Sequence, residues 1–376
     1  MKPHRYCLPL FLIVIFLKDA TGQNVVFPVI RDIKGSARSV KEVCYKAGIK
    51  MDKVVKGAEL KKCNYLLDTK SKLLEKDDYD SAGTLIERYV ANFDDNENAL
   101  EETQYTPDSV LNKFRFRYDA KGNQVAWMSF TMEDTAIARG SYHYDDKGRI
   151  TSDSLFDAKG NLSKCALFTF DGEEHLEKEV HIAVHGNKTI DNYVFDMDGN
   201  KIQDNRTALD GTTLYIMRIK YNHDGRQSQL DILTDSGNDY EPFEKYKYDD
   251  AGNITEDIRY AGGKIQWRHA VTYDSAKRVT SSAYFDKDDK PVNKQTFVFD
   301  GTGHKLEEAT YKADTLFKKT VCKYDAKGNK TEVDIYNGGE LHKALIDYDK
   351  MGNPVKEIAY NNDEAITITE REILYY

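Results

Sequence analysis

The sequence predicts an all-β protein built from tandem β-hairpins of roughly 25 residues each. A short phrase, an aromatic residue followed by Asp and then by Gly three residues later, recurs along most of the chain. Other turn sequences lie between consecutive phrases, and the stretches between turns alternate with the strand period of two. We therefore expect a twisted antiparallel meander curled into an open spiral, with a six-bladed propeller as the alternative.

The first 22 residues have the features of a signal peptide. Lys2 and Arg5 precede an apolar run from Leu8 to Leu17, and small residues close the segment at Gly22. The run is about ten residues, whereas a helix needs about 20 to cross a hydrocarbon core. We expect a mature chain that starts near Gln23, is exported to the periplasm or the extracellular space, and is not inserted in a membrane. An uncleaved membrane anchor is the alternative.

Composition argues against two classes of partner. Lys and Arg number 54 against 63 Asp and Glu, which gives a net charge of -9. Nucleic acids and anionic membranes both need a concentrated positive face, and here charges of both signs are interspersed. The expected partner is therefore a protein or a glycan, and no nucleic acid.

The chain lacks any segment that resembles a linker. It holds only 7 prolines in 376 residues, and turn sequences recur about every 12 or 13 residues. We divide it into the signal peptide (1–22), an irregular N-terminal cap (23–63) and a hairpin repeat array (64–376).

The repeated phrase has the chemistry of a chain reversal. Asp at the first position of a type I turn accepts hydrogen bonds from backbone amides, and the following Gly adopts the left-handed conformation. Degenerate copies at Asp171 and Asp274 lack this Gly. The structural turns singled out are Asp119 with Gly122, Asp145 with Gly148, Asp196 with Gly199, Asp249 with Gly252, Asp325 with Gly328, and Asp349 with Gly352.

Between the phrases lie second reversals, such as Asp210-Gly211 and Gly262-Gly263, so each unit contributes two strands. The strands alternate: Phe114 and Phe116 share one face while Arg115 lies on the other. We expect one aromatic face with cross-strand ladders and one solvated face. The polar last strand, 366–376, is interpreted as a blunted exposed edge.

Cys44 and Cys63 are candidates for a disulfide, because export permits one and a bond here would staple the first hairpins. Cys165 and Cys322 lie far apart in the array and are expected to be buried free thiols. The chain has no CxxC spacing, which argues against thiol redox chemistry or a zinc knuckle.

The repeated phrase resembles the YD repeat of the RHS family, whose unit is Tyr-Asp-x-x-Gly followed by Arg or Asn and a strand. The resemblance spans most of the mature chain. Large RHS proteins wind such strands into a shell around a toxin domain. This chain is too short to enclose one and often carries Asn in place of Arg, so it is more similar to the small exported YD-repeat proteins of bacteria related to Bacteroides. That resemblance implies no activity.

No catalytic centre, cofactor site or metal site is predicted. His181 and His185 have the outer spacing of a zincin helix, but the Glu is missing and the context is a strand. The acidic segments 94–98 and 286–289 lack the Gly and terminal Glu of an EF-hand. Nucleophile elbows, P-loops and dinucleotide fingerprints are absent from the sequence.

Trp127 and Trp267 lie in predicted strands and are candidates for stacking on a sugar ring, with packing in the core as the alternative. The leading hypothesis is a noncatalytic exported binding or scaffold protein that presents an extended sheet face to a protein or glycan. A carboxylate-based hydrolase is the first alternative. An inhibitor or immunity partner of a secreted toxin is the second.

Overall fold

The computed structural model describes residues 33–131, 133–172, 175–183, 188–233 and 239–376, and these residues form a single 26-stranded sheet without helices. The strands are β1 (Ala37–Lys50), β2 (Lys53–Leu67), β3 (Leu73–Tyr79), β4 (Leu85–Phe93), β5 (Ala99–Thr106), β6 (Ser109–Tyr118), β7 (Gln124–Phe130), β8 (Ala136–Tyr144), β9 (Ile150–Asp157), β10 (Leu162–Phe170), β11 (Leu176–Ala183), β12 (Thr189–Phe195), β13 (Lys201–Ala208), β14 (Thr213–Tyr221), β15 (Gln227–Leu233), β16 (Tyr240–Tyr248), β17 (Ile254–Ala261), β18 (Lys264–Tyr273), β19 (Val279–Asp286), β20 (Pro291–Phe299), β21 (Lys305–Lys312), β22 (Thr315–Tyr324), β23 (Lys330–Asn337), β24 (Glu340–Tyr348), β25 (Pro354–Asn361) and β26 (Glu364–Tyr375).

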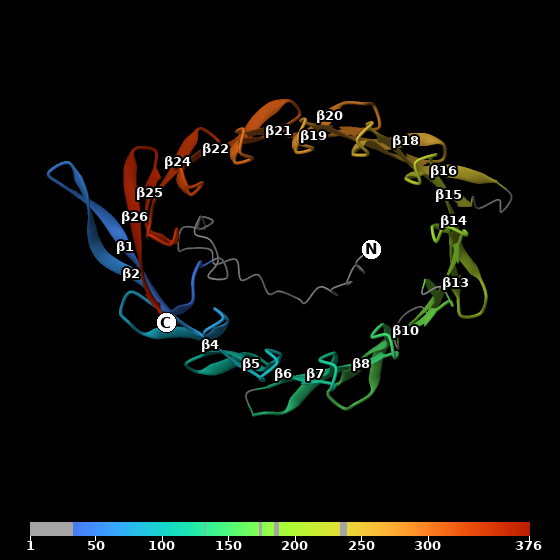
Figure 1. Ribbon diagram of the computed structural model, residues 1–376, viewed down its shortest axis with the longest axis horizontal. Coiled ribbons are helices and arrows are strands. Elements are labelled where there is room, and N and C mark those ends of the chain that lie inside the picture. The colour runs from blue at the N-terminus through green and yellow to red at the C-terminus, as the bar shows by residue number, and fades with distance from the viewer. Residues whose placement is uncertain (1–32, 132, 173–174, 184–187, 234–238) are drawn as a thin grey trace.

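The sheet closes on itself. Each strand pairs antiparallel with its neighbours in sequence, and β1 also pairs with β26, so the strands form one ring (Figure 1). The expected open spiral is therefore wrong, and so is the alternative propeller. Turn sequences specify only which neighbouring strands pair, whereas closure depends on pairing between the two ends of the chain. In that pairing Arg371 reaches Glu42 across 329 positions of sequence.

The two ends of the array form regular strands. The interpretation of 366–376 as an exposed edge is wrong, because β26 pairs with β1 along most of its length, for example through Thr369 and Cys44. The segment 23–63, expected as an irregular cap, contributes β1 and most of β2 where it is described; these strands are 14 and 15 residues long. Closure pairs the two end strands of the array with each other, while the outer part of the β1–β2 hairpin, including residues 53–61 of β2, extends beyond the stretch of β2 that pairs with β3.

Alternate turns lie at opposite ends of the ring, because all pairings are antiparallel. We call one end the Asp rim. Its turns are 68–72, 94–98, 119–123, 145–149, 171–175, 196–200, 222–226, 249–253, 274–278, 300–304, 325–329 and 349–353. Most of the repeated phrases identified in the sequence lie here, and the second reversals lie at the opposite rim.

The turn at 119–123 illustrates the geometry of the Asp rim. The Gly122 amide donates to the Asp119 carbonyl at 3.0 Å, and Gly122 has a φ of 84°. The Asp119 carboxylate accepts from the amides of Lys121 and Asn123 at 2.9 Å, and from the Asn123 side chain at 2.9 Å. The same Gly-to-Asp bond of 2.9–3.1 Å forms at Asp145 with Gly148, Asp196 with Gly199, Asp249 with Gly252, Asp325 with Gly328, and Asp349 with Gly352.

A degenerate phrase makes the same turn without its glycine. At 274–278 the left-handed position is taken by Lys277, with a φ of 62°, and its amide donates to Asp274 at 3.0 Å. As in the turns that keep their glycine, the Asp274 carboxylate binds both the amide and the side chain of the fifth residue, here the guanidinium of Arg278. The Asp side chain therefore organises the turn even where glycine is missing.

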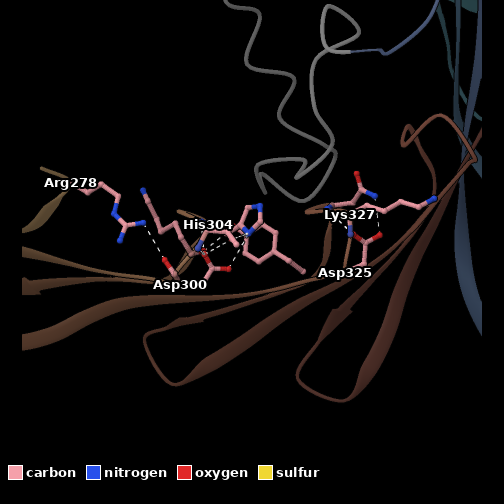
Figure 2. Close-up of polar contacts among 9 residues, drawn as sticks. Arg278, Asp300, His304, Asp325 and Lys327 are labelled. Carbon is pink, nitrogen blue, oxygen red and sulfur yellow. Dashed lines mark hydrogen bonds and ion pairs between the residues drawn. The ribbon is translucent and has the colours of Figure 1, made fainter. Parts of the chain in front are cut away.

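Adjacent turns of the Asp rim are linked to each other (Figure 2). The Tyr324 hydroxyl donates to the Lys305 carbonyl, one unit earlier, at 2.9 Å. His304 Nδ1 donates to the Asp300 carboxylate of its own turn at 3.0 Å, and the His304 ring stacks on Tyr324 of the next unit with centroids 4.6 Å apart. The expected aromatic ladder is thus largely an alternation of rings with polar side chains. Comparable ring contacts are Lys72 with Phe93, Arg149 with Phe170, His175 with Phe195, Arg226 with Tyr248, and Arg278 with Phe299.

The ring closes at the Asp rim through the two ends of the array. Asn353 is fully buried, accepts from the Lys34 amide at 2.7 Å, and donates to the Lys34 carbonyl at 2.8 Å. Its side chain also donates to the Tyr375 hydroxyl, which in turn donates to Asp349, both at 2.7 Å. The 349–353 turn therefore binds Lys34, just before β1, and Tyr375, at the end of β26. These two residues lie where the next hairpin of the array would otherwise lie.

Two faces follow from the register, since directly opposed residues share a face. The aromatic face carries the ring that precedes each Asp, with pairs such as Phe116 and Trp127. The ionic face carries ion pairs, such as Arg115 with Glu101 at 2.7 Å.

Buried hydrophobic clusters are small: one joins Ile33, Ala37, Val40 and Leu67, and another joins Cys322, Val333 and Ala344. Within the described ranges, no helix is long and apolar enough to span a membrane.

We expect Asn353→Ala to destabilise the protein more than Asn123→Ala. Both changes remove the side chain from the same turn position, but Asn353 also satisfies the backbone of Lys34 in a buried site. The loss should be about 1–3 kcal/mol for Asn353 and about 0.5–1.5 kcal/mol for Asn123. Urea unfolding followed by circular dichroism measures both. Equal losses would contradict the role of Asn353 in closure.

Candidate functional site

The strongest candidate site lies on the aromatic face where β16 to β19 run side by side. Opposed pairs bring Tyr246 to Asp257, Asp257 to His269, and His269 to Tyr284. Two residues further along β17, Arg259 lies opposite both Glu244 and Trp267. We call this set the Trp267 site; its residues are Glu244, Tyr246, Asp257, Arg259, Trp267, His269 and Tyr284.

Aromatic rings form one end of the Trp267 site. His269 and Tyr284 stack in parallel, with centroids 4.1 Å apart and planes 7° apart. Trp267 meets Tyr284 at 6.2 Å with a tilt of 59°. A shallow depression of about 370 Å³ opens beside these rings and is also lined by Gln266 and Asn293. Since Tyr284 is 41% exposed, a flat ligand can reach its ring.

Carboxyl groups form the other end. Burial and, as a second cause, the charge of the neighbouring Glu244 together raise the pKa of Asp257 to about 6. The buried Asp257 Oδ1 has no donor, and Glu244 can supply one only if the pair holds a proton. Tyr246 donates to Glu244 at 2.6 Å, and Arg259 lies 3.7 Å from it. Asp257 is the member of this pair whose pKa is shifted toward neutrality.

Burial also lowers the pKa of His269. Its Nε2 lies 2.8 Å from the hydroxyl of Ser282 on β19. At neutral pH the ring is therefore uncharged, and it can both stack on Tyr284 and take part in hydrogen bonds. The Trp267 site thus combines flat apolar rings with several donors and acceptors.

Trp127 lies in a different setting, on β7. It pairs with Phe116 on one side and with Gly140 on the other. Phe114 packs against its ring at 6.3 Å, and a Cβ at position 140 would collide with the indole. The indole also hydrogen-bonds Tyr142. The Trp127 indole is half-buried, and neighbouring residues cover it. Trp267 is therefore the better candidate for stacking on a sugar ring.

The sequence pointed to Trp267 but not to its neighbours. Glu244 and Asp257 lie on different strands, and their proximity depends on a register that sequence does not display. His269 and Tyr284 follow the strand period of two, so alternation places each on the face of the nearest aromatic residues. The alternation shows that His269 and Tyr284 lie on the aromatic face, but it does not show that the two rings are in contact.

The expected disulfide is not formed. Cys63 lies opposite Glu42, and Cys44 lies opposite Lys61, so the two cysteines are not paired in the register. The Cys63 thiol donates instead to Asp78 at 2.6 Å. Burial is the main reason that its pKa rises to about 12, which makes Cys63 a poor nucleophile. Cys165 is a half-buried thiol, and Cys322 is buried.

The histidine and acidic motifs do not gather ligands. His181 lies 3.0 Å from Glu179 and 3.7 Å from Asp191, which is already bound by Arg206 at 2.6 Å. His185 lies outside the described residues, as does the signal peptide. The acidic segments 94–98 and 286–290 are hairpin turns. In the part of the chain that the structure describes, no group of three or more His, Cys, Asp or Glu could hold a metal ion.

We expect the fluorescence of Trp267 to report the ionisation of Asp257. In a Trp127→Phe background, emission should change with a midpoint near pH 6, because Asp257 gains its charge beside the ring. Adding Asp257→Asn should remove the step, and adding His269→Gln should leave it. A step that survives Asp257→Asn would assign the titration to another group.

Comparisons with known proteins give limited guidance. A family model described as "Uncharacterised protein" matches residues 78–230. Comparison with curated proteins finds no match.

Several solved structures are similar to the chain at low identity. The Photorhabdus luminescens Tc holotoxin pore is 12% identical over 82% of this chain and 19% of that chain, with a TM-score of 0.40. The TcdB2-TccC3-TEV crystal structure is 11% identical over 81% and 19%, with a TM-score of 0.39. This chain therefore spans about a fifth of each toxin chain. A porin-like protein from Bacteroides uniformis is 8% identical over 91% and 98%, with a TM-score of 0.21. These similarities are too low to define the fold or the function of this chain.

Proposed function

We propose that the chain is a noncatalytic exported binding protein that holds a glycan at the Trp267 site. The observation that carries this proposal is the exposed Tyr284 ring beside Trp267, with a shallow depression between them and a row of polar groups. Sugar rings have flat C–H faces that stack on aromatic side chains and hydroxyls that need donors and acceptors. The Trp267 site offers both kinds of contact.

The polar groups suit neutral or amino sugars better than acidic ones. Glu244 is anionic, and Asp257 becomes anionic above about pH 6. Arg259 is already engaged by Glu244, so the site has little free positive charge for a carboxylate or sulfate. Protein ligands remain an outcome of the test, since the same face could take a peptide.

Two further parts of the proposal come from the sequence. The repeated Tyr-Asp-x-x-Gly phrase supports membership of the RHS family, in the group of small exported proteins with YD repeats. The N-terminal apolar segment supports export to the periplasm or the cell surface. A closed ring with paired edges suits a scaffold that works outside the cytoplasm, where it must resist aggregation without chaperones.

The test is a glycan array followed by titration of the mature protein with any glycan that binds. Trp267→Ala should weaken binding about 30-fold, since truncating a central Trp typically costs about 2 kcal/mol. Trp127→Ala is the matched control, because it removes the other tryptophan of the chain from the same face; its affinity should stay within twofold.

Two outcomes would overturn the proposal. One is an array with every spot at background, while protein partners co-purify from envelope or medium fractions. The other is equal loss of affinity in both tryptophan variants, which would indicate general unfolding. Circular dichroism of each variant separates that case from loss of the site.

A carboxylate-based hydrolase is the second candidate, favoured by the shared proton of Glu244 and Asp257. Glycosidase carboxyls stand at least about 5 Å apart, however, and groups that share a proton are closer. We therefore rank this function below binding. Incubation of bound glycans with the protein, followed by a reducing-end assay, tests it: release that Asp257→Asn abolishes would make the protein an enzyme. An inhibitor of a secreted toxin ranks last, because it would need one strongly acidic patch. The ionic face instead mixes positive and negative side chains, as in the pairs of Arg115 with Glu101 and Lys319 with Glu307.

A further inference from the structure

The closing pair of strands differs from the other pairings in the ring. Every other adjacent pair is consecutive in sequence and is joined by a short connection, whereas β26 and β1 are joined only through the rest of the chain. Therefore β26 and β1 can separate without disrupting a turn. Pairing them carries the entropic cost of closing a very long loop. We call the surface formed by β25, β26, β1 and β2 on the aromatic face the seam.

A buried carboxyl lies in the seam. Glu357 on β25 is 7% exposed, and its Oε2 has no hydrogen-bond partner. Ile346 lies opposite it on β24, and Thr369 lies opposite it on β26. A buried acid with a carboxyl oxygen that has no donor is unusual.

An ion pair crosses the closing strands beside Glu357. Arg371 on β26 donates to Glu42 on β1 at 2.6 Å, and the Arg371 side chain is 4% exposed. Glu357 is attracted by Arg371 and repelled by Glu42. When Glu357 is ionised, the seam holds two carboxylates for one guanidinium in a poorly solvated site. When it is neutral, the charges of Arg371 and Glu42 balance.

Other ionisable groups on this face complete the setting. They are Tyr348 on β24, Tyr375 on β26, Cys44 and Lys46 on β1, Lys61, Cys63 and Tyr65 on β2, and Lys76 and Asp78 on β3. Lys76 contacts Asp78 at 2.5 Å, and Lys61 lies 3.8 Å from it. Burial raises the pKa values of Tyr348, Tyr65 and Cys63, so these three stay neutral at physiological pH. Among the described groups of the seam, Glu357 is the one whose pKa is shifted close to neutrality.

We propose that Glu357 makes closure of the ring pH-dependent: the β26–β1 seam is tight while this carboxyl is protonated and loosens when it ionises.

The direction follows from the environment of Glu357. Burial raises its pKa from the ordinary value of 4.5 to about 7, against the opposing charge of Arg371. An acid with a raised pKa in the closed state contributes stability that is fully present below about pH 4.5 and is lost as pH rises through about 7. With these two values, linkage predicts roughly a tenfold rise in the opening equilibrium constant between pH 6 and pH 8.

Amide hydrogen exchange of the mature protein tests the proposal, with rates converted to protection factors so that intrinsic pH effects cancel. Protection of β1 and β26 amides should fall about tenfold from pH 6 to pH 8. Protection of β13 and β14, on a distant part of the ring, should stay constant. A parallel fall in both regions, or no fall at the seam, would overturn the proposal.

Matched variants locate the effect. Glu357→Gln should make seam protection independent of pH, while Glu332→Gln, on the ionic face of β23, should leave the wild-type profile unchanged. A pH dependence that persists in Glu357→Gln would assign it to another group and overturn the proposal. If Glu357→Gln fails to fold, Glu42→Gln serves instead: removing this charge should move the midpoint below that of the wild type, and an unmoved midpoint would count against the proposal.

Discussion

The structure depends on the pairing of β1 with β26. A sheet one layer thick has few buried apolar clusters to hold it together, and its described core clusters are small. Its stability must come largely from backbone ladders, turn hydrogen bonds and cross-strand contacts, each worth about 1 kcal/mol or less. Such a sheet leaves two unsatisfied edges unless it closes. Closure through β1 and β26 satisfies both edges at once, and Asn353 secures it at the rim.

The Asp rim explains how a repeated phrase can build a ring of this size. Within each turn, the Asp side chain binds backbone amides and the residue at the fifth position. Between turns, the aromatic hydroxyl reaches back to the preceding unit, as Tyr324 does to Lys305. Such contacts orient one unit relative to the next, and curvature accumulates around the rim until the ring closes (Figure 1). Regular curvature of this kind brings the first and last strands together.

Function belongs to the places where the regular pattern is interrupted. At the Trp267 site, the neighbouring carboxyl groups of Glu244 and Asp257 lie on the same face as the exposed ring of Tyr284, and the pKa of Asp257 is raised. At the seam, Glu357 has one carboxyl oxygen, Oε2, without a hydrogen-bond partner and lies next to the ion pair of Arg371 and Glu42. Both places retain a perturbed acid that a purely structural repeat does not need. The Trp267 site is suited to hold a ligand, and the seam is suited to regulate closure of the ring.

The sequence by itself determined the strands, the turns and the alternation of faces, because these depend on contacts within a few residues. Asp119 and Gly122 make a reversal whatever the rest of the chain does. Closure, the cysteine partners and the carboxyl pair at Glu244 were decided only by the tertiary structure. They depend on register and on the curvature summed over all 26 strands, and local composition carries no information about either.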